Sequence, residues 1–363
     1  MIKICLLYVN CGSGHRMAAQ SLYSRLRENK NNAVKLIDLG KFSSFPGFYE
    51  RGYRIIVTKF PFLWHLLYNL YSHALCGKIV FWFNLISFAR FFRYLNGERP
   101  DVVISTHFFA SSLVSYYKKR HADISLRLMT VVTDFGVYPL WVNPYTDYYF
   151  VASSDTREQM IRDYGVEKEK VIVSGIPVRE QFFHPLDRRE LSKKYALPLD
   201  KFCVFIFSSD MGVGPIKKVI EELKDEVGVL VSYGNNLQLK EHLEKIARSC
   251  RYLRIFGRIE AIWEVMELAD VVVTKAGGIS VSECLVKKKP MVFIYVFYGQ
   301  EERNVEFILK KKMGFRPSTA LEVVELLRNL KDNPSQFSRV RQRLINFDFP
   351  DAADKIASIL SKL

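Results

Sequence analysis

The sequence predicts an α/β protein built from two doubly wound, Rossmann-like domains with a cleft between them. Short apolar segments alternate with helical ones along most of the 363 residues, which is the βαβ pattern of a mostly parallel sheet. A polar, proline-marked stretch, GIPVREQFFHPLDRRELSKKYALP, interrupts this series, and a second series of apolar segments follows it. A chain of this length holds two domains of ordinary size. We therefore expect domains at residues 1–177 and 178–344.

The first series opens with IKICLLYV, which is apolar on both faces, as a buried parallel strand should be. The helix expected after it, HRMAAQSLYSRLREN, carries Ala18, Leu22 and Leu26 on one stripe. Five strands are expected here: 2–9, 33–39, 101–107, 126–135 and 148–154. Five more are expected in the second series: 201–209, 227–234, 252–257, 270–277 and 290–296.

The chain is strongly basic, with a formal net charge of +15 and a pI near 9.4. An acidic partner is expected: nucleic acid, an anionic membrane surface or a phosphorylated substrate. No nucleic-acid-binding motif is present, so nucleic acid is not expected as a partner. The N-terminus shows no signal-peptide pattern, and no run of about 18 apolar residues is free of charge. We expect a cytoplasmic protein whose six scattered cysteines are buried thiols.

An insert at residues 48–99 combines aromatic, aliphatic and basic side chains. It contains Trp64, Trp82, Arg90 and Arg93 and has few acidic residues. Aromatic rings settle at the lipid headgroup level while cations meet anionic lipid, so this composition favours an interfacial membrane contact. The alternative is that this insert forms a pair of ordinary core helices with one solvent-exposed face.

Polar residues follow the expected strands of the first domain. The stretch VNCGSGHRMAAQ places Gly12, Gly14 and His15 after the first strand, and STHF places His107 after a later one. Asp134 and Trp141 come from VVTDFGVYPLW. Ligands of open α/β sheets bind outside the carboxyl ends of the strands, so we expect these residues at one edge.

Glycine turns that precede helices mark the second domain. Gly212 and Gly214 form one turn, and TKAGGISVSE contains another. A turn of this kind at a helix N-terminus points free backbone N–H groups at an anion. The residues expected to surround a nucleotide sugar are Gly212, Gly214, Gly234, Asn235, Arg258, Ile259, Lys275, Gly277, Gly278, Ser280, Glu283, Gln300, Glu301 and Asn304. Taken alone, Glu283 also fits a capping-box acid paired with Ser280.

Several motifs occur in one order: GSGH, STHF, TVVTDF, VSGIPVR, MGVGPI, TKAGGISVSE and GQEERN. In this the chain resembles the processive diacylglycerol glucosyltransferases and monogalactosyldiacylglycerol synthases, and more distantly the lipid II-forming N-acetylglucosaminyltransferase. The resemblance implies a GT-B fold whose last helix, within 345–363, packs back on the first domain. It also implies a UDP-sugar in the second domain, a lipid acceptor in the first and no metal or other cofactor.

The resemblance assigns roles to individual residues. Glu283 would bind the ribose of UDP and the backbone of Ile259 the uracil. Gly214, Gly278 and Ser280 would surround the diphosphate, and Gln300 and Glu301 the sugar. His15 would be the base at the acceptor hydroxyl, with Asp134 as its rival or helper. The chain departs from the family at Tyr138 and Asn143, where histidines are usual.

These observations together predict an inverting glycosyltransferase. The enzyme would move a hexose, with glucose favoured and galactose the alternative, from UDP-hexose to diacylglycerol at the inner face of the cell membrane. Transfer to another lipid, such as a polyprenyl-linked acceptor, and a non-catalytic UDP-sugar sensor are the alternatives. A nicotinamide-dependent oxidoreductase fits Gly12-x-Gly14 and Asp38, but Met17 occupies the place of the third glycine of that fingerprint.

Overall fold

The computed structural model describes residues 1–10, 12–44, 86–207, 216–223, 226–294, 296 and 299–362. The chain forms two compact units, one of Met1–Arg179 with Pro350–Leu363 and one of Glu180–Phe349. The first unit thus ends at residue 179, against the expected 177, and the chain returns to it at 350, against the expected 345.

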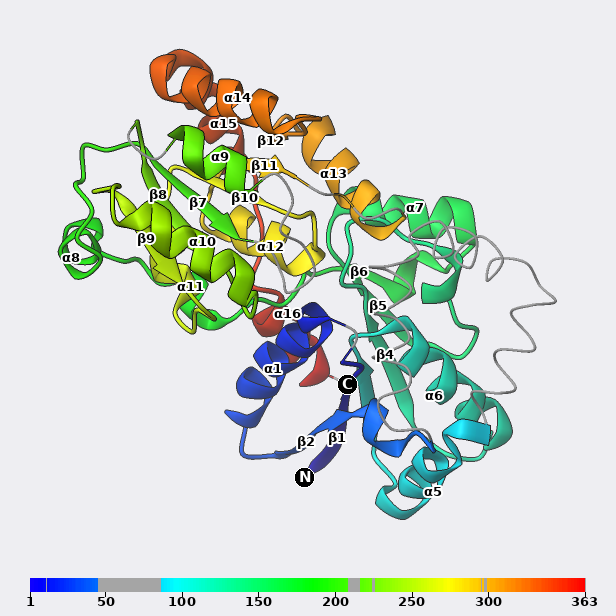
Figure 1. The fold of residues 1–363 in the computed structure, drawn as a ribbon. Coiled ribbons are helices and arrows are strands. Elements are labelled where there is room, and N and C mark those ends of the chain that lie inside the picture. Colours follow the sequence, from blue (N-terminus) through cyan, green and yellow to red (C-terminus); the bar gives the residue numbers. More distant parts are fainter. Residues whose placement is uncertain are drawn as a thin grey trace. The chain divides into compact units, whose positions relative to one another are not determined.

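The first unit is built on a parallel six-stranded sheet (Figure 1). Its strands are β1 (Ile2–Tyr8), β2 (Asn32–Asp38), β3 (Val102–Ser105), β4 (Arg127–Val131), β5 (Tyr148–Val151) and β6 (Val171–Val173). They lie in the order β2-β1-β3-β4-β5-β6. The chain moves from β1 to β2 on one side and returns to β3 on the other. The strand order therefore reverses between β1 and β3, which is where α/β sheets bind ligands.

Helices cover both faces of this sheet. They are α1 (Ser13–Arg27), α5 (Ala89–Glu98), α6 (Phe108–Arg120), α7 (Ser154–Tyr164) and α16 (Ala352–Leu360). Side chains alternate between the two faces of a strand. Accordingly, Ile4 and Leu6 of β1 pack in one core cluster with α1 and α16, whereas Cys5 and Leu7 pack in another with α5 and α6. This alternation explains why the first strand is apolar throughout.

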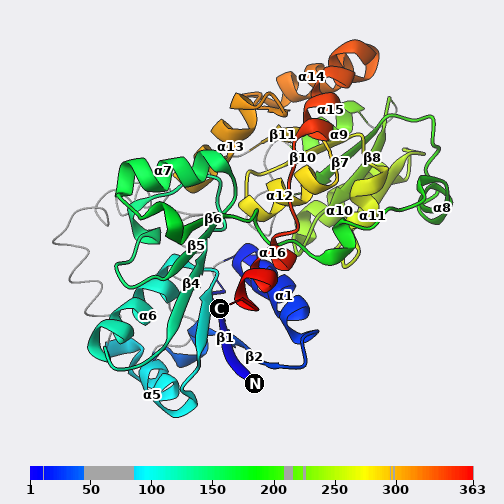
Figure 2. The ribbon, with the colours of Figure 1, turned by 180° about the vertical axis from the view of Figure 1, so that it is seen from behind.

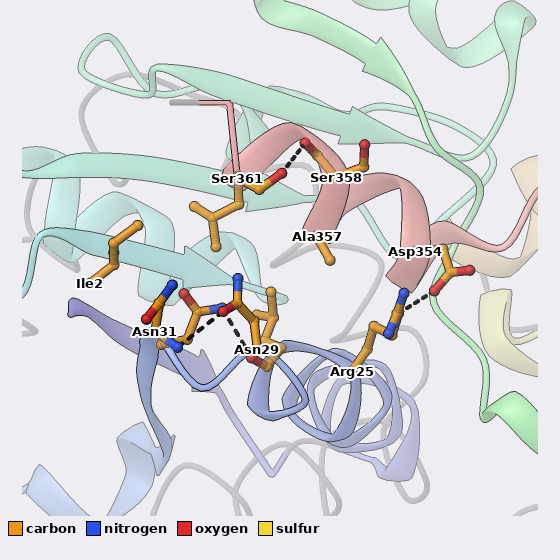
Figure 3. Close-up of a pocket in the computed structure, with 11 residues that line it drawn as sticks. Ile2, Arg25, Asn29, Asn31, Asp354, Ala357, Ser358 and Ser361 are labelled. Carbon is orange, nitrogen blue, oxygen red and sulfur yellow. Dashed lines mark hydrogen bonds and ion pairs between the residues drawn. The ribbon is translucent and has the colours of Figure 1, made fainter.

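The C-terminal helix α16 packs against α1, and the two lie side by side in both views (Figures 1 and 2). Ile356 and Leu360 are buried in the core cluster that also holds Leu22. At the surface, Arg25 of α1 forms an ion pair with Asp354 of α16. A cavity of about 350 Å³ beside this pair is lined by residues of both helices and by the amino ends of β1 and β2 (Figure 3).

The second unit has its own parallel six-stranded sheet, in the order β12-β11-β10-β7-β8-β9. Its strands are β7 (Cys203–Phe207), β8 (Gly228–Ser232), β9 (Leu253–Phe256), β10 (Val271–Thr274), β11 (Met291–Phe293) and β12 (Gly314–Phe315). Its helices are α8 (Arg188–Lys194), α9 (Ile216–Leu223), α10 (Leu237–Ala247), α11 (Ile262–Leu268), α12 (Gly278–Val286), α13 (Gln300–Lys310), α14 (Ala320–Asp332) and α15 (Pro334–Asn346). The strand order reverses between β7 and β10. The turn that leads into α12 therefore lies at the reversal.

The structure confirms the predicted α/β class and all ten predicted strands. It adds two edge strands, β6 and β12, of three and two residues. Strands this short carry no readable alternation, and they are recognised only by their pairing with β5 and β11.

Two further observations bear on the sequence predictions. Cys5, Cys203, Cys250 and Cys284 are buried free thiols, as expected, while Cys11 and Cys76 lie outside the described residues. Among the described helices, none combines the length and apolarity that a membrane span requires.

Candidate active site

The first group of predicted site residues meets where β1 and β3 lie side by side. Gly12 precedes α1 with a φ of 86° and a ψ of 165°, a conformation essentially restricted to glycine. Gly12 gives α1 no side-chain cap. The chain then turns into the helix, which carries Gly14 and His15 in its first turn.

His15 is held by a carbonyl from the neighbouring strand end. Its Nδ1 atom lies 2.8 Å from the carbonyl oxygen of Thr106 and 3.0 Å from the Oγ1 atom of Thr133. A carbonyl oxygen only accepts hydrogen bonds, so Nδ1 must carry the proton. The neutral ring therefore presents an unprotonated Nε2 with a free lone pair. The Thr106 hydroxyl also donates to the carbonyl oxygen of His15, at 2.9 Å, which fixes the backbone as well.

The surroundings keep His15 neutral. Burial lowers its pKa to about 4, although the hydrogen bond to Thr106 acts in the opposite direction. Desolvation disfavours the charged imidazolium. At neutral pH the lone pair on Nε2 is therefore available to take a proton.

His107 presents the opposite tautomer. Its ring lies edge-on to that of His15, with centroids 4.4 Å apart. The Phe109 backbone N–H donates to Nδ1 of His107 at 3.1 Å, where the histidine caps the start of α6. Nδ1 is thus an acceptor, and the proton of neutral His107 resides on Nε2. Burial lowers the pKa of His107 well below its ordinary value, and nearby His15 adds to this effect. The pair therefore offers one lone pair and one N–H donor.

Asp134 and Trp141, also predicted in the first unit, are both buried. Asp134 is buried and follows Thr133, the residue whose hydroxyl lies beside His15. Trp141 is fully buried, and its ring packs edge-on against Phe108, with centroids 5.8 Å apart. Tyr138 belongs to the same core cluster. Trp141 and Tyr138 therefore support the loop by packing, and neither lines an open surface.

Part of the aromatic insert is described. Arg90 and Arg93 are exposed on α5, one helical turn apart. On the other side of α5, Phe92 stacks on Tyr117 of α6, with ring centroids 6.2 Å apart. Trp64 and Trp82 lie outside the described residues. α5 therefore combines a packed aromatic side with exposed cations.

In the second unit, the turn before α12 has an open helix N-terminus. Gly277 is the N-cap and provides no side-chain hydrogen bond. Its φ of −66° and ψ of 137° suit any residue, and an added Cβ would lie 4.0 Å from its nearest neighbours, Lys275 Cε and Ser280 Oγ. Neither conformation nor crowding therefore requires a glycine here.

Helix α13 contacts this turn twice. The Lys275 ammonium lies 2.8 Å from the Glu301 carboxylate. One turn further along α13, the side-chain amide of Asn304 donates to the carbonyl oxygen of Ala276 at 2.8 Å. Helix α13, which carries the predicted sugar-binding Glu301, is therefore joined to the turn that leads into α12.

Glu283 is 3% exposed on α12. The capping-box alternative for this residue is wrong, because Gly277 caps α12 and Ser280 already lies inside its first turn. Glu283 is thus a carboxylate buried on the helix that begins at the open turn.

The other predicted residues of the second unit follow β8 and β9 or begin α13. Gly234 has a φ of 57°, and Asn235 beside it is exposed. Arg258 is exposed, whereas Ile259 and Gln300 are half-buried. Gly212 and Gly214 lie outside the described residues. Thr106, Thr133 and Ala276 also contribute to these contacts and were not predicted, because they act through backbone or hydroxyl groups that no motif marks.

Family models and known proteins match this chain along most of its length. The model for monogalactosyldiacylglycerol synthase matches residues 15–178, and that for the glycosyltransferase family 28 C-terminal domain matches residues 214–356. The chain carries glycosyltransferase domains in both halves and is a glycosyltransferase. The two matches favour a glycosyltransferase over the nicotinamide-dependent oxidoreductase.

This glycosyltransferase is similar to two enzymes named processive diacylglycerol β-glucosyltransferase. The Bacillus licheniformis enzyme is 27% identical over 366 residues, covering 98% of this chain and 93% of its own. The Bacillus mycoides enzyme is 29% identical over 324 residues, covering 85% and 80% respectively.

Solved structures share the fold of the glycosyltransferase at low identity. MurG from Acinetobacter baumannii has a TM-score of 0.67 at 13% identity, over the whole of both chains. Anabaena HepE, solved in complex with UDP-glucose, has a TM-score of 0.59 at 13% identity, again over the whole of both. The predicted GT-B fold is confirmed.

Proposed function

We propose that this glycosyltransferase moves a hexose from a UDP-sugar to the free hydroxyl of diacylglycerol, with inversion at the anomeric carbon. Glucose is the favoured sugar, and galactose is the alternative. The names of the similar Bacillus enzymes support the acceptor and the sugar. HepE with UDP-glucose supports the donor at the level of the fold.

The contact between His15 and Thr106 carries the proposal. An alkyl hydroxyl is a weak nucleophile at neutral pH, and a base that takes its proton contributes roughly 10²–10⁴-fold. His15 Nε2 accepts the hydroxyl proton while the acceptor oxygen bonds to C1 of the sugar. The bond between C1 and the phosphate oxygen breaks, and UDP leaves. A single displacement of this kind inverts C1.

The leaving UDP gains negative charge at its β-phosphate. The open N-terminus of α12 at Gly277 offers backbone N–H groups and a positive helix end for that charge. Lys275 adds a cation two residues earlier. We propose that these groups stabilise the leaving group without a bound metal. Glu283 would hold the ribose hydroxyls and Ile259 the uracil.

Helix α5 and the insert before it would place the enzyme on the membrane, where diacylglycerol is dissolved. Exposed Arg90 and Arg93 suit contact with anionic headgroups at the cytoplasmic face, at roughly 1 kcal/mol per charge.

The test is synthesis by the purified protein. Diacylglycerol vesicles are incubated with UDP-glucose or UDP-galactose, with and without EDTA, and the lipid product is identified by mass and its anomeric linkage by NMR. A β-linked monohexosyl product that forms in EDTA is expected. Product from a polyprenyl-linked acceptor alone would overturn diacylglycerol as the acceptor. Binding of UDP-sugar without product from any lipid would indicate a non-catalytic sensor.

A further inference from the structure

Two side chains of α13 hold two consecutive residues of the turn that precedes α12. Glu301 pairs with Lys275 at 2.8 Å, and Asn304 donates to the carbonyl of Ala276 at 2.8 Å. Residues three apart on a helix share one face. One face of α13 therefore contacts the turn at two points.

Asn304 is wholly buried, with no exposed surface. An amide in that position has no surface with which to meet a sugar in this structure, and its donor is already directed at a backbone carbonyl. The Glu301 carboxylate faces the Lys275 ammonium. Both residues thus contact the turn through their side chains.

The hydrogen bond to Ala276 has a consequence for the next residue. A peptide unit is planar and trans, so the Ala276 carbonyl and the Gly277 N–H point in opposite directions. A donor that fixes the carbonyl therefore also aims that N–H. Gly277 is the N-cap residue of α12, at the helix end where the diphosphate is proposed to bind.

We infer that Asn304 is a positioning residue for the diphosphate, acting through the Ala276–Gly277 peptide rather than by contact with the sugar. This rests on the proposed UDP-sugar site. It assigns the effect of Asn304 to the part of the donor that all UDP-sugars share, and leaves discrimination between sugars to other residues.

Calorimetric titration with UDP and with UDP-glucose separates the two roles, because UDP lacks the hexose that UDP-glucose carries. Asn304→Ala is expected to weaken both ligands by about tenfold and leave their affinity ratio unchanged, since one hydrogen bond to a buried carbonyl is lost. Glu306→Gln, an exposed change on the same helix, is the matched control and should bind both ligands like wild type. Thermal unfolding without ligand checks each fold. If Asn304→Ala does not fold, Asn304→Ser, which keeps a shorter donor, replaces it, with the same expected ratio.

Weaker binding of UDP-glucose with unchanged UDP affinity would show a direct sugar contact and overturn the inference alone. Unchanged binding of both ligands would overturn it as well. A wild-type protein that binds neither ligand would overturn the proposed donor and the inference with it. If the wild type makes glycolipid from a UDP-sugar but Asn304→Ala binds as in either outcome above, only the inference fails.

Discussion

The Nδ1 atom of His15 lies 2.8 Å from the carbonyl oxygen of Thr106, so a backbone group selects the tautomer of the proposed base. The lone pair of the neutral ring is thereby placed on Nε2. His107, 4.4 Å away between ring centroids, is set to the opposite tautomer by the Phe109 N–H. Two histidines that look equivalent in the sequence thus differ in chemistry: His15 presents a lone pair on Nε2, and His107 presents an N–H on Nε2.

Replacing His15 by Ala should reduce kcat at least a hundredfold, because a general base contributes roughly 10²–10⁴-fold. UDP affinity should stay within about twofold, since no proposed UDP contact is removed. Turnover is measured as glycolipid formed per minute, and UDP affinity by calorimetry. His121→Ala is the matched control, because its Nδ1 also lies near a backbone carbonyl, that of Tyr117 at 3.0 Å, but at the far end of α6. Near-normal turnover of His15→Ala would remove His15 as the base.

Protonation of His15 should lie far below neutral pH. Its pKa is about 4 in the fold, against 6.5 for an ordinary histidine, because burial disfavours the charged ring. The stabilisation that this neutral ring provides is present above pH 6.5 and is lost as the pH falls toward 4, because the unfolded chain takes up the proton first. Histidine NMR signals should show no titration of His15 or His107 between about pH 6 and 8. A midpoint near 6.5 for His15 would contradict its burial.

The two glycine turns should respond differently to alanine. Gly277→Ala should leave the melting temperature unchanged, because its φ of −66° suits alanine and the nearest atoms lie 4.0 Å from the new Cβ. It should nevertheless weaken UDP binding about tenfold by blocking close approach to the backbone. Gly12→Ala should instead lower the melting temperature, because a φ of 86° costs a non-glycine residue about 1–3 kcal/mol. UDP binding by Gly277→Ala equal to wild type would remove Gly277 from the donor site.

The exposed cations of α5 should matter for membrane binding. The double change Arg90→Ala and Arg93→Ala should weaken sedimentation with anionic vesicles by roughly tenfold or more, at about 1 kcal/mol per charge. Binding to neutral vesicles should change little. Arg339→Ala with Arg341→Ala removes the same charge from exposed positions on α15 and serves as the control. Equal losses from both double variants would indicate a net-charge effect instead of a surface on α5.

Much of the fold was predictable because its signals are local. Apolar residues on both faces of β1 indicate a buried parallel strand. The apolar stripe through Ala18, Leu22 and Leu26 indicates helix α1. The edge strands β6 and β12 were not predictable, because two or three residues carry no periodicity. For Glu283, the sequence left a capping role open until Gly277 was seen to cap α12.

The sequence by itself determined two Rossmann-like units, the glycine turns at their strand ends and the residue types available for chemistry, since each depends on neighbours a few positions apart. Only the tertiary structure decided what those residues do. The tautomer of His15 depends on a carbonyl 91 residues away, and the aim of the Gly277 N–H depends on Asn304, whose partner Ala276 is 28 residues away. A hydrogen bond of that kind exists only when packing brings two strand ends or two helices together, and no local pattern encodes its direction.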